Sequence, residues 1–291
     1  MDECQGPSYN PAHSHAAVKG SAAESRMNSP PPDLSIIIPV FNEEHRLPQT
    51  LERISAFLSA HSMRGEIIVV DDGSSDGTPA VTARSRAQMP DLRVVRHERN
   101  HGKGFSVRQG MLQARADIAL FTDADLSTPI EEADKLIAAI QRDGYDGAIG
   151  SRAIDRTLIQ VHQSAVREWA GILFNRAVRW IAGIRYSDTQ CGFKAFRLSR
   201  ARILFEQQRI EGFGFDAEIL FLAKRQGLRV AEIPVRWSHD SATKVRVAAD
   251  GMRMVLDLLR IRGRAWMGLY QPAKPLLAQT PVPQSKRERS G

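Results

Sequence analysis

Residues 120–129 read Leu-Phe-Thr-Asp-Ala-Asp-Leu-Ser-Thr-Pro, and they join a predicted strand to a predicted helix through two carboxylates. The apolar run over 118–121 predicts a buried strand. Thr128, followed by Pro129 and by Glu131, predicts a capping box at the start of the helix. The two aspartates therefore lie at the carboxyl end of a strand, where open α/β sheets bind their ligands.

Asp123 and Asp125 are one residue apart, so their side chains project to the same side of the strand end. Burying either carboxylate without a partner costs several kcal/mol. A divalent cation, Mg²⁺ or Mn²⁺, is the natural partner, and a diphosphate would complete its coordination, since magnesium takes only one or two carboxylates from the protein. A solvated, Asp-rich turn is the alternative that this stretch alone leaves open.

Composition indicates an ordinary globular protein of one or two domains, with 291 residues, 42% hydrophobic and 25% charged. The two cysteines, Cys4 and Cys191, do not suggest a disulfide framework and favour a reducing cytosol. The chain has no apolar run of 18 residues and no signal-peptide pattern at its start. We therefore expect a cytoplasmic protein that does not span a membrane.

The formal net charge of +7 is unevenly distributed, because residues 264–291 contain five basic side chains and one acidic side chain. A basic surface favours polyanionic partners: nucleic acid, anionic lipid or phosphorylated substrates. We expect no nucleic-acid partner, because the sequence has neither zinc-finger spacing nor an RNA-binding aromatic signature.

The pattern along the chain predicts a disordered leader (1–33), one folded domain (34–262) and a basic, flexible tail (263–291). Within the domain, strands and helices alternate, which predicts an α/β fold with a mostly parallel central sheet and helices on both faces. The expected strands cover 35–40, 66–70, 92–95, 118–121 and 146–149, and the expected helices cover 43–62, 105–115 and 130–142.

Beyond Gly150 the alternation stops, and residues 152–187 contain no clear strand. An amphipathic helix is predicted over 166–181, and after it a helix around 216–226 and a strand over 229–235. A last helix is predicted over 250–262. Its apolar side chains could enter a membrane interface while its arginines face anionic headgroups, or the apolar stripe could pack on the core.

Acidic residues follow three of the predicted strands, within 39–43, 71–74 and 123–125. The carboxyl ends of neighbouring parallel strands meet at one edge, because such strands lie about 4.8 Å apart. Each segment alone could be a strand-ending turn. Together they predict a site with acceptors for a nucleoside and a metal beside it.

The order and spacing of these three segments resemble those of glycosyltransferase family 2, the nucleotide-sugar transferases of the GT-A fold, a Rossmann-like nucleotide-sugar domain. The resemblance covers about 34–262. Within the family, the sequence is most similar to the dolichyl-phosphate β-glucosyltransferases and related polyprenyl-phosphate sugar synthases. The segments that carry the narrower resemblance are 100–104, 150–152, 188–194, 214–218 and 232–237.

The resemblance implies roles for individual residues. The nucleoside would be held by Pro39, Phe41, Glu43, Asp71 and Asp72. Asp123 would lie near the ribose and the metal, and Asp125 would bind the metal directly.

Two further positions of that donor site leave alternatives open. Ser127 stands where mannosyl relatives often have a metal-assisting glutamine, which puts a third protein ligand in doubt. Lys103, between two glycines, is either a diphosphate contact or a solvated lysine.

Arg152 and Arg167 are the candidates for binding an acceptor phosphate, with Lys194 as a weaker one. A lipid phosphate has a second pKa near 6 and is already an ionised nucleophile at neutral pH, so it needs cations that orient it and no general base. An alcohol acceptor would need a base, for which Asp188 and Asp216 are available. The sequence alone leaves the acceptor open.

The leading hypothesis is an inverting transferase that moves a hexose, most simply glucose from UDP-glucose, to polyprenyl or dolichyl phosphate at the cytoplasmic face of a membrane. The alternatives within the fold are mannose from GDP-mannose and transfer to a soluble hydroxyl acceptor. From other classes, an aspartate phosphohydrolase and a non-catalytic sugar-nucleotide binder remain open.

Overall fold

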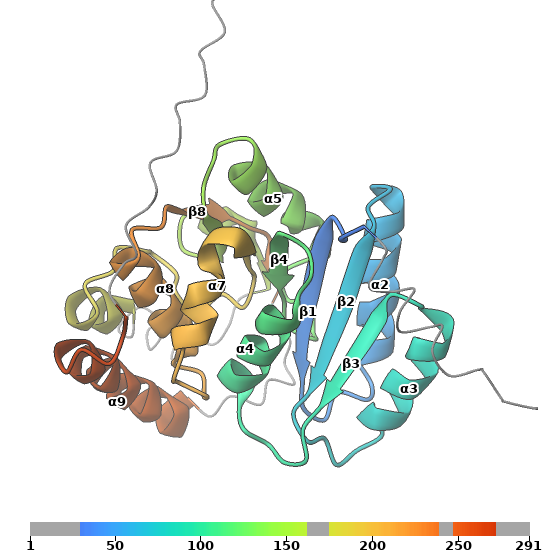
Figure 1. The fold of residues 1–291 in the computed structure, drawn as a ribbon, viewed down its shortest axis with the longest axis horizontal. Coiled ribbons are helices and arrows are strands. Elements are labelled where there is room, and N and C mark those ends of the chain that lie inside the picture. Colours follow the sequence, from blue (N-terminus) through green and yellow to red (C-terminus); the bar gives the residue numbers. More distant parts are fainter. Residues whose placement is uncertain (1–29, 162–174, 239–246, 272–291) are drawn as a thin grey trace, which may run out of the picture. The chain divides into compact units, whose positions relative to one another are not determined.

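The computed structural model describes residues 30–161, 175–238 and 247–271. Contacts divide the chain into Met1–Pro31 and Pro32–Gly291, and the elements described below belong to the second unit. Its main strands are β1 (Leu34–Val40), β2 (Gly65–Asp71), β3 (Leu92–Arg96), β4 (Ile118–Phe121), β5 (Gly147–Ser151), β7 (Lys194–Arg197) and β8 (Val230–Pro234). They form one seven-stranded sheet in the order β3-β2-β1-β4-β7-β5-β8. Figure 1 shows β3, β2, β1 and β4 side by side.

Helices cover both faces of this sheet, because successive side chains of each strand point to opposite faces. The helices are α2 (Leu47–Ala60), α3 (Thr78–Gln88), α4 (Lys103–Gln113), α5 (Ala133–Gln141), α7 (Leu198–Gln207), α8 (Phe215–Arg225) and α9 (Val247–Trp266), with 3-10 turns η1 (Ile130–Glu132) and η2 (Arg156–Leu158). Ile36 and Ile38 pack in a buried cluster with α2 and α5, and Ile37 packs in a second cluster with α4, α7, α8 and α9. The predicted α/β class is confirmed.

The sheet is mostly parallel, as predicted, but β7 runs antiparallel between β4 and β5. Its four residues are too short to show a period in the sequence, and the prediction missed it. A second, two-stranded sheet pairs β6 (Ile159–Val161) with β9 (Trp237–Ser238). The expectation that residues 152–187 hold no strand was therefore wrong at β6.

Strand β1 is the point at which the chain changes direction across the sheet. From β1 the chain continues to β2 and β3 on one side and then returns to β4 on the other side. Such a reversal opens a crevice at the carboxyl ends of the strands. The predicted convergence of three strand ends is confirmed, since β2, β1 and β4 are neighbours.

Two predicted helix starts differ from the structure. Helix α2 begins at Leu47 and not at residue 43, because residues 42–44 are engaged in hydrogen bonds with the turn after β2. The predicted capping box does not form. The Thr128 hydroxyl lies 3.7 Å from Cys191 Sγ, Glu131 pairs with Arg53, and the helix begins with the 3-10 turn η1 without a side-chain cap.

The last helix, predicted over 250–262, runs over Val247–Trp266. The chain stays packed beyond it, because Tyr270 is buried and its hydroxyl donates to Glu218 Oε1 at 2.6 Å. Of the helix predicted over 166–181, the structure describes residues from 175 onward, which are helical to 181. Within the described ranges, no helix combines the length and the apolarity that a membrane span requires.

Candidate active site

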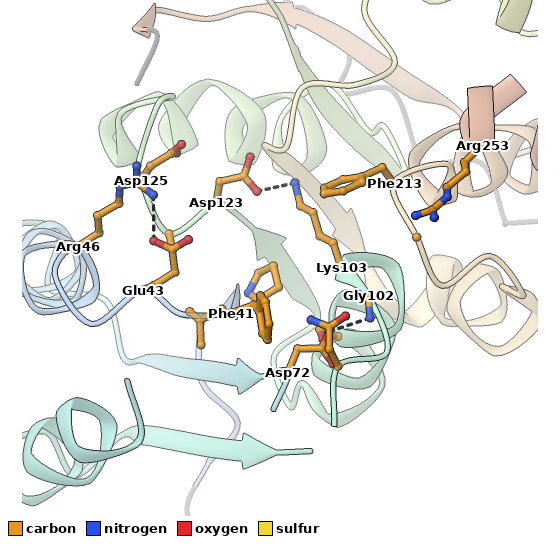
Figure 2. A pocket seen from close by; sticks show the side chains of 16 residues that line it. Phe41, Glu43, Arg46, Asp72, Gly102, Lys103, Asp123, Asp125, Phe213 and Arg253 are labelled. Carbon is orange, nitrogen blue, oxygen red and sulfur yellow. Dashed lines mark hydrogen bonds and ion pairs between the residues drawn. The ribbon is translucent and has the colours of Figure 1, made fainter. Parts of the chain in front are cut away.

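A pocket of about 590 Å³ opens at the carboxyl ends of β1, β2 and β4 (Figure 2). Ten of its lining residues are labelled there: Phe41, Glu43, Arg46, Asp72, Gly102, Lys103, Asp123, Asp125, Phe213 and Arg253. Pro39 also lines it. The pocket therefore brings together most of the residues that the sequence assigned to a donor nucleotide.

The segment after β1 is held in place by the turn after β2. Asn42 adopts a left-handed conformation with φ of 56°, and its side-chain oxygen accepts from the Ser75 amide at 2.8 Å. The Glu43 amide donates to the Thr78 hydroxyl at 2.8 Å. A left-handed φ outside glycine persists only where surrounding contacts fix it. The serine- and threonine-rich turn thus positions Phe41 and Glu43 in the pocket, a supporting role that the sequence prediction missed.

Asp72 organises the segment that leads into α4. Its carboxylate accepts from the amides of Gly102 at 2.7 Å and His101 at 3.0 Å, and lies 2.9 Å from His97 Nδ1. Gly102 has a φ of 113°, and a Cβ there would meet the Glu211 carbonyl at 2.6 Å, so glycine is required. Asp72 therefore fixes the backbone immediately before Lys103.

Asp71 lies apart from the pocket wall. Its side chain is completely buried, accepts from the Ser74 amide at 2.9 Å and lies 3.5 Å from Arg96 Nε. The two aspartates at the end of β2, which the sequence treated as equivalent donor contacts, thus have different surroundings. Asp72 lines the pocket, and Asp71 holds the turn beneath it.

Asp123 forms an ion pair with Lys103, whose Nζ lies 2.5 Å from Oδ1 (Figure 2). Although burial disfavours the lysine's charge, Asp123 and then Asp216 raise the pKa of Lys103. Gly192 packs so closely against the Asp123 carboxylate that a Cβ would approach its Oδ2 to 2.2 Å. The first carboxylate of the pair is therefore fixed from both sides.

Asp125 lies in surroundings that disfavour its negative charge. Its Oδ1 accepts from the Ser127 amide at 2.9 Å, but burial and then the charge of Asp123 raise its pKa. The next residue, Leu126, has a φ of 46°, a conformation that costs an apolar residue about 1–3 kcal/mol. The turn is tied to α2 by the Thr50 hydroxyl, which donates to the Ala124 carbonyl at 2.5 Å. Backbone strain at Leu126 and repulsion between two carboxylates thus meet at the Asp-Ala-Asp turn.

The donor set at this turn fits a hard divalent cation. Among the described residues, no group of three or more His, Cys, Asp or Glu side chains is arranged to hold a metal. Asp123 and Asp125 supply two carboxylates beside the pocket. Magnesium typically takes that number from the protein and completes its shell with water and phosphate oxygens. A cation that also binds a diphosphate would relieve the repulsion that raises the pKa of Asp125.

Arg152 directly follows β5 and is held in a bidentate ion pair. Its Nε lies 2.6 Å from Asp188 Oδ2 and its Nη2 lies 2.9 Å from Oδ1, while the guanidinium lies 5.4 Å from the Trp237 ring centre. Burial disfavours its charge, but Asp188 and more weakly Asp123 outweigh burial and raise the pKa of Arg152. Glu232 in turn accepts from the Asp188 amide at 2.7 Å. This support fixes the direction of the guanidinium.

The other two residues predicted to contact the acceptor, Lys194 and Arg167, are not placed at the site by the structure. Lys194 was predicted to contact the acceptor, but its side chain is completely buried and its Nζ donates to Asp216 and to the Cys191 carbonyl. It lies on β7 in the middle of the sheet, where it neutralises a buried carboxylate, so the prediction was wrong. Arg167 lies outside the described residues.

Arg253 of α9 is a pocket residue that the sequence did not identify as one, because the helical pattern predicted that it faces lipid headgroups. Figure 2 shows its guanidinium beside Phe213, across the pocket from Asp125. Among the described residues no carboxylate forms an ion pair with it. Its position depends on a contact between distant elements, of which the sequence pattern carries no signal.

The sequence matches the family described as "Glycosyl transferase family 2" over residues 35–197. It is 35% identical to the dolichyl-phosphate beta-glucosyltransferase of Saccharomyces cerevisiae, over 83% of this chain and 77% of that protein. It is 36% identical to the enzyme of the same name from Drosophila melanogaster, over 88% of this chain and 82% of that protein.

A solved structure, that of glucosyl-3-phosphoglycerate synthase from Mycobacterium tuberculosis in complex with Mn²⁺, UDP and glucosyl-3-phosphoglycerate, matches the fold with a TM-score of 0.58. The sequences are 18% identical, and the match covers 87% of each chain.

Proposed function

The chain belongs to glycosyltransferase family 2, an enzyme family of the GT-A fold, and we propose that it transfers glucose from UDP-glucose to a dolichyl or polyprenyl phosphate with inversion at the anomeric carbon. The observation that carries the proposal is the Asp123–Asp125 turn at a nucleotide-sized pocket, with Arg152 fixed at the end of another strand. Relatives that are named dolichyl-phosphate beta-glucosyltransferases support the sugar and the acceptor class.

On the donor side, Pro39 and Phe41 provide an apolar wall for the base, and Glu43 and Asp72 line the same part of the pocket. Asp123 and Asp125 would hold Mg²⁺ or Mn²⁺, which, when bound, supplies neutralisation of the charge that develops on the departing diphosphate. Lys103, at the start of α4, adds a cation on the same side.

On the acceptor side, Arg152 orients a phosphate oxygen toward the anomeric carbon. A lipid phosphate is mostly ionised at neutral pH, so no group on the protein has to remove a proton. Fixing two reactants in line is itself a large contribution to rate, and the bidentate support from Asp188 holds the guanidinium in one direction. Arg167 belongs to the same proposal as a second cation.

The ion pairs of the site weigh against a hydroxyl acceptor. Such an acceptor needs a general base, and the two carboxylates that the sequence offered for this role, Asp188 and Asp216, are engaged by Arg152 and Lys194. A GDP-mannose donor is the second candidate within the fold, but the relatives described above are glucosyltransferases by name. The phosphohydrolase and the non-catalytic binder are not favoured by the family match.

The proposal places the enzyme peripherally at the cytoplasmic face of a membrane, because its acceptor is a membrane lipid. The test is to incubate the purified full chain with radiolabelled UDP-glucose, Mg²⁺ and a polyprenyl phosphate. We expect label in the lipid fraction and none from GDP-mannose. Release of free glucose alone, or transfer only from GDP-mannose, would overturn the proposal.

A further inference from the structure

Six of the nine large exposed apolar side chains of the described residues lie in one part of the chain. They are Met252, Leu256, Leu259, Trp266, Met267 and Leu269, all on α9 or in the three residues after it. Among the described residues, the other large exposed apolar side chains are Phe41, Ile154 and Trp180. Trp266 is 91% exposed. Contiguous exposed apolar surface of this kind marks an interaction site.

The spacing of these side chains places them on one face of α9. Positions 252, 256, 259 and 266 fall within one stripe, because an α-helix advances by 3.6 residues per turn. The packing of α9 on the domain is made by other residues, since Leu258 and Ile261 are completely buried. The exposed stripe is therefore not needed to attach the helix.

Arginines border this stripe on both sides. Arg253 and Arg260 lie seven residues apart on one flank, and Arg262 lies on the other, and all three are exposed. Arg262 also lines a hollow of about 520 Å³ with Arg225 and Trp266. The apolar stripe is thus framed by positive charge, which is complementary to anionic headgroups.

The stripe also begins beside the active-site pocket. Met252 is exposed, and its neighbour Arg253 lines the pocket next to Phe213 (Figure 2). A phosphate presented at the α9 surface would therefore meet a cation that already belongs to the site. A protein partner would not require this continuity, whereas a lipid substrate does.

We infer that this surface, the α9 docking face, binds an anionic phospholipid bilayer and presents the pocket to it. The α9 docking face consists of the exposed apolar side chains of 252–269 and the arginines that border them. Leu, Met and Trp suit shallow insertion at the headgroup boundary, and each bordering arginine strengthens binding to an anionic leaflet by about fivefold. The inference rests on the proposed function for the lipid nature of the acceptor, and it adds the surface by which the enzyme reaches it.

The first test is sedimentation of the full chain with vesicles of phosphatidylcholine, with and without phosphatidylglycerol. We expect binding to the anionic vesicles that weakens with added salt, since the screening length is about 8 Å at physiological ionic strength. Leu256→Ser/Leu259→Ser should weaken binding by about a hundredfold, from the apolar area withdrawn from the bilayer. Arg262→Gln should weaken it by about fivefold. The control is Ile154→Ser, an exposed apolar position outside α9, which should bind like the wild type.

The second test separates this inference from the proposed function. With a short-chain, water-soluble prenyl phosphate and no vesicles, Leu256→Ser/Leu259→Ser should transfer glucose at the wild-type rate. With a polyprenyl phosphate embedded in vesicles, its rate should fall in proportion to its binding. If the wild type is inactive with both acceptors but still binds vesicles through Leu256 and Leu259, the proposed function fails and the α9 docking face stands.

Three results would overturn the inference. One is wild-type protein that stays in the supernatant with anionic vesicles at low salt. Another is vesicle binding that is unchanged in Leu256→Ser/Leu259→Ser, with thermal unfolding confirming that this variant is folded. The third is light scattering that shows a wild-type dimer which the same variant splits, because the face would then be covered by a second copy of the chain.

Discussion

Lys103 Nζ lies 2.5 Å from Asp123 Oδ1, so a lysine ammonium group is paired with the first carboxylate of the Asp-Ala-Asp turn. A cation that binds Asp123 has to share this carboxylate with the ammonium group or displace it. Like charges this close repel by several kcal/mol in a partly buried site. The ion pair therefore opposes metal binding in the absence of a diphosphate, which would give Lys103 an alternative anion.

Replacing Lys103 by methionine should strengthen metal binding and weaken nucleotide binding. We expect Lys103→Met to bind Mn²⁺ at least about tenfold more tightly than the wild type without nucleotide, because the competing charge is gone. The same variant should bind UDP more weakly. Calorimetric titration measures both, with Lys135→Met, whose lysine pairs with Glu132, as the matched control. Unchanged Mn²⁺ affinity would show that the ion pair does not compete with the metal.

Asp125→Asn should abolish transfer while preserving the fold. Loss of one of the two carboxylates that we propose to bind the metal removes stabilisation of the departing diphosphate, a contribution usually worth several kcal/mol, so the rate should fall at least about a hundredfold. Because burial and Asp123 raise the pKa of Asp125, removing its charge should not lower the thermal unfolding temperature. Asp134→Asn, a partly exposed position on α5, is the control. Wild-type turnover at low magnesium would contradict the metal assignment.

Arg152→Lys should lower the rate of transfer to the acceptor without weakening donor binding. Lysine keeps the charge but cannot reproduce the bidentate geometry on Asp188, so transfer to a prenyl phosphate should fall by about ten- to a hundredfold. The dissociation constant of UDP-glucose should stay at the wild-type value. Equal weakening of donor binding in the same titration would place Arg152 on the donor side.

The Asp188–Arg152 pair predicts a particular dependence of stability on pH. Burial alone would raise the pKa of Asp188, but Arg152 and neighbouring amides lower this pKa from 3.8 to about 2. A carboxyl with a lowered pKa in the folded state stabilises the protein above its ordinary pKa, and this stabilisation is lost as the pH falls toward the folded value.

Urea unfolding should therefore show a contribution of about 2 kcal/mol that disappears between about pH 4 and about pH 2 in the wild type. Asp188→Asn should be less stable at neutral pH, because Arg152 loses its partner, and its stability should change less across that interval. A variant whose pH dependence equals that of the wild type would show that the ion pair contributes nothing.

Arg253→Ala tests a pocket residue that belongs to a distant helix. Removing a cation that lines the pocket should raise the KM for a soluble prenyl phosphate or for UDP-glucose by about tenfold, and the affected substrate identifies the anion that Arg253 meets. Arg262→Ala, on the same helix but outside this pocket, should leave both values unchanged. Unchanged constants for both variants would remove Arg253 from the site.

The segments that could be predicted were those whose structure follows from a short stretch of their own sequence. β1, β2 and β4 are continuous apolar strands followed by polar turns, so the sequence indicated both the strands and the meeting of their ends. Pro39, Phe41, Glu43, Asp72 and Asp123 line one pocket for this reason, and Lys103, which the sequence left as either a diphosphate contact or a solvated lysine, lines it too.

The rest depends on contacts between distant segments. Lys194 resembles a surface cation in the sequence, and only the insertion of β7 into the sheet buries it against Asp216. Asp71 and Asp72 are adjacent in the sequence but have different partners, because the strand alternation turns one inward and the other toward the pocket. Arg253 enters the pocket through the packing of α9, which its own helical pattern does not specify.

The antiparallel strand β7 also constrains how the protein folds. β4 pairs with β1 on one side, but its other edge stays open until residues 194–197, far along the chain, have been synthesised and paired with it. Such non-local pairing is slow to form, because the loop between the strands must be closed first. Gly192, which contacts the Asp123 carboxylate, arrives with this strand. The Asp-Ala-Asp turn can therefore reach its final geometry only late in folding, so a nascent chain that ends before β7 would have the motif but not the site.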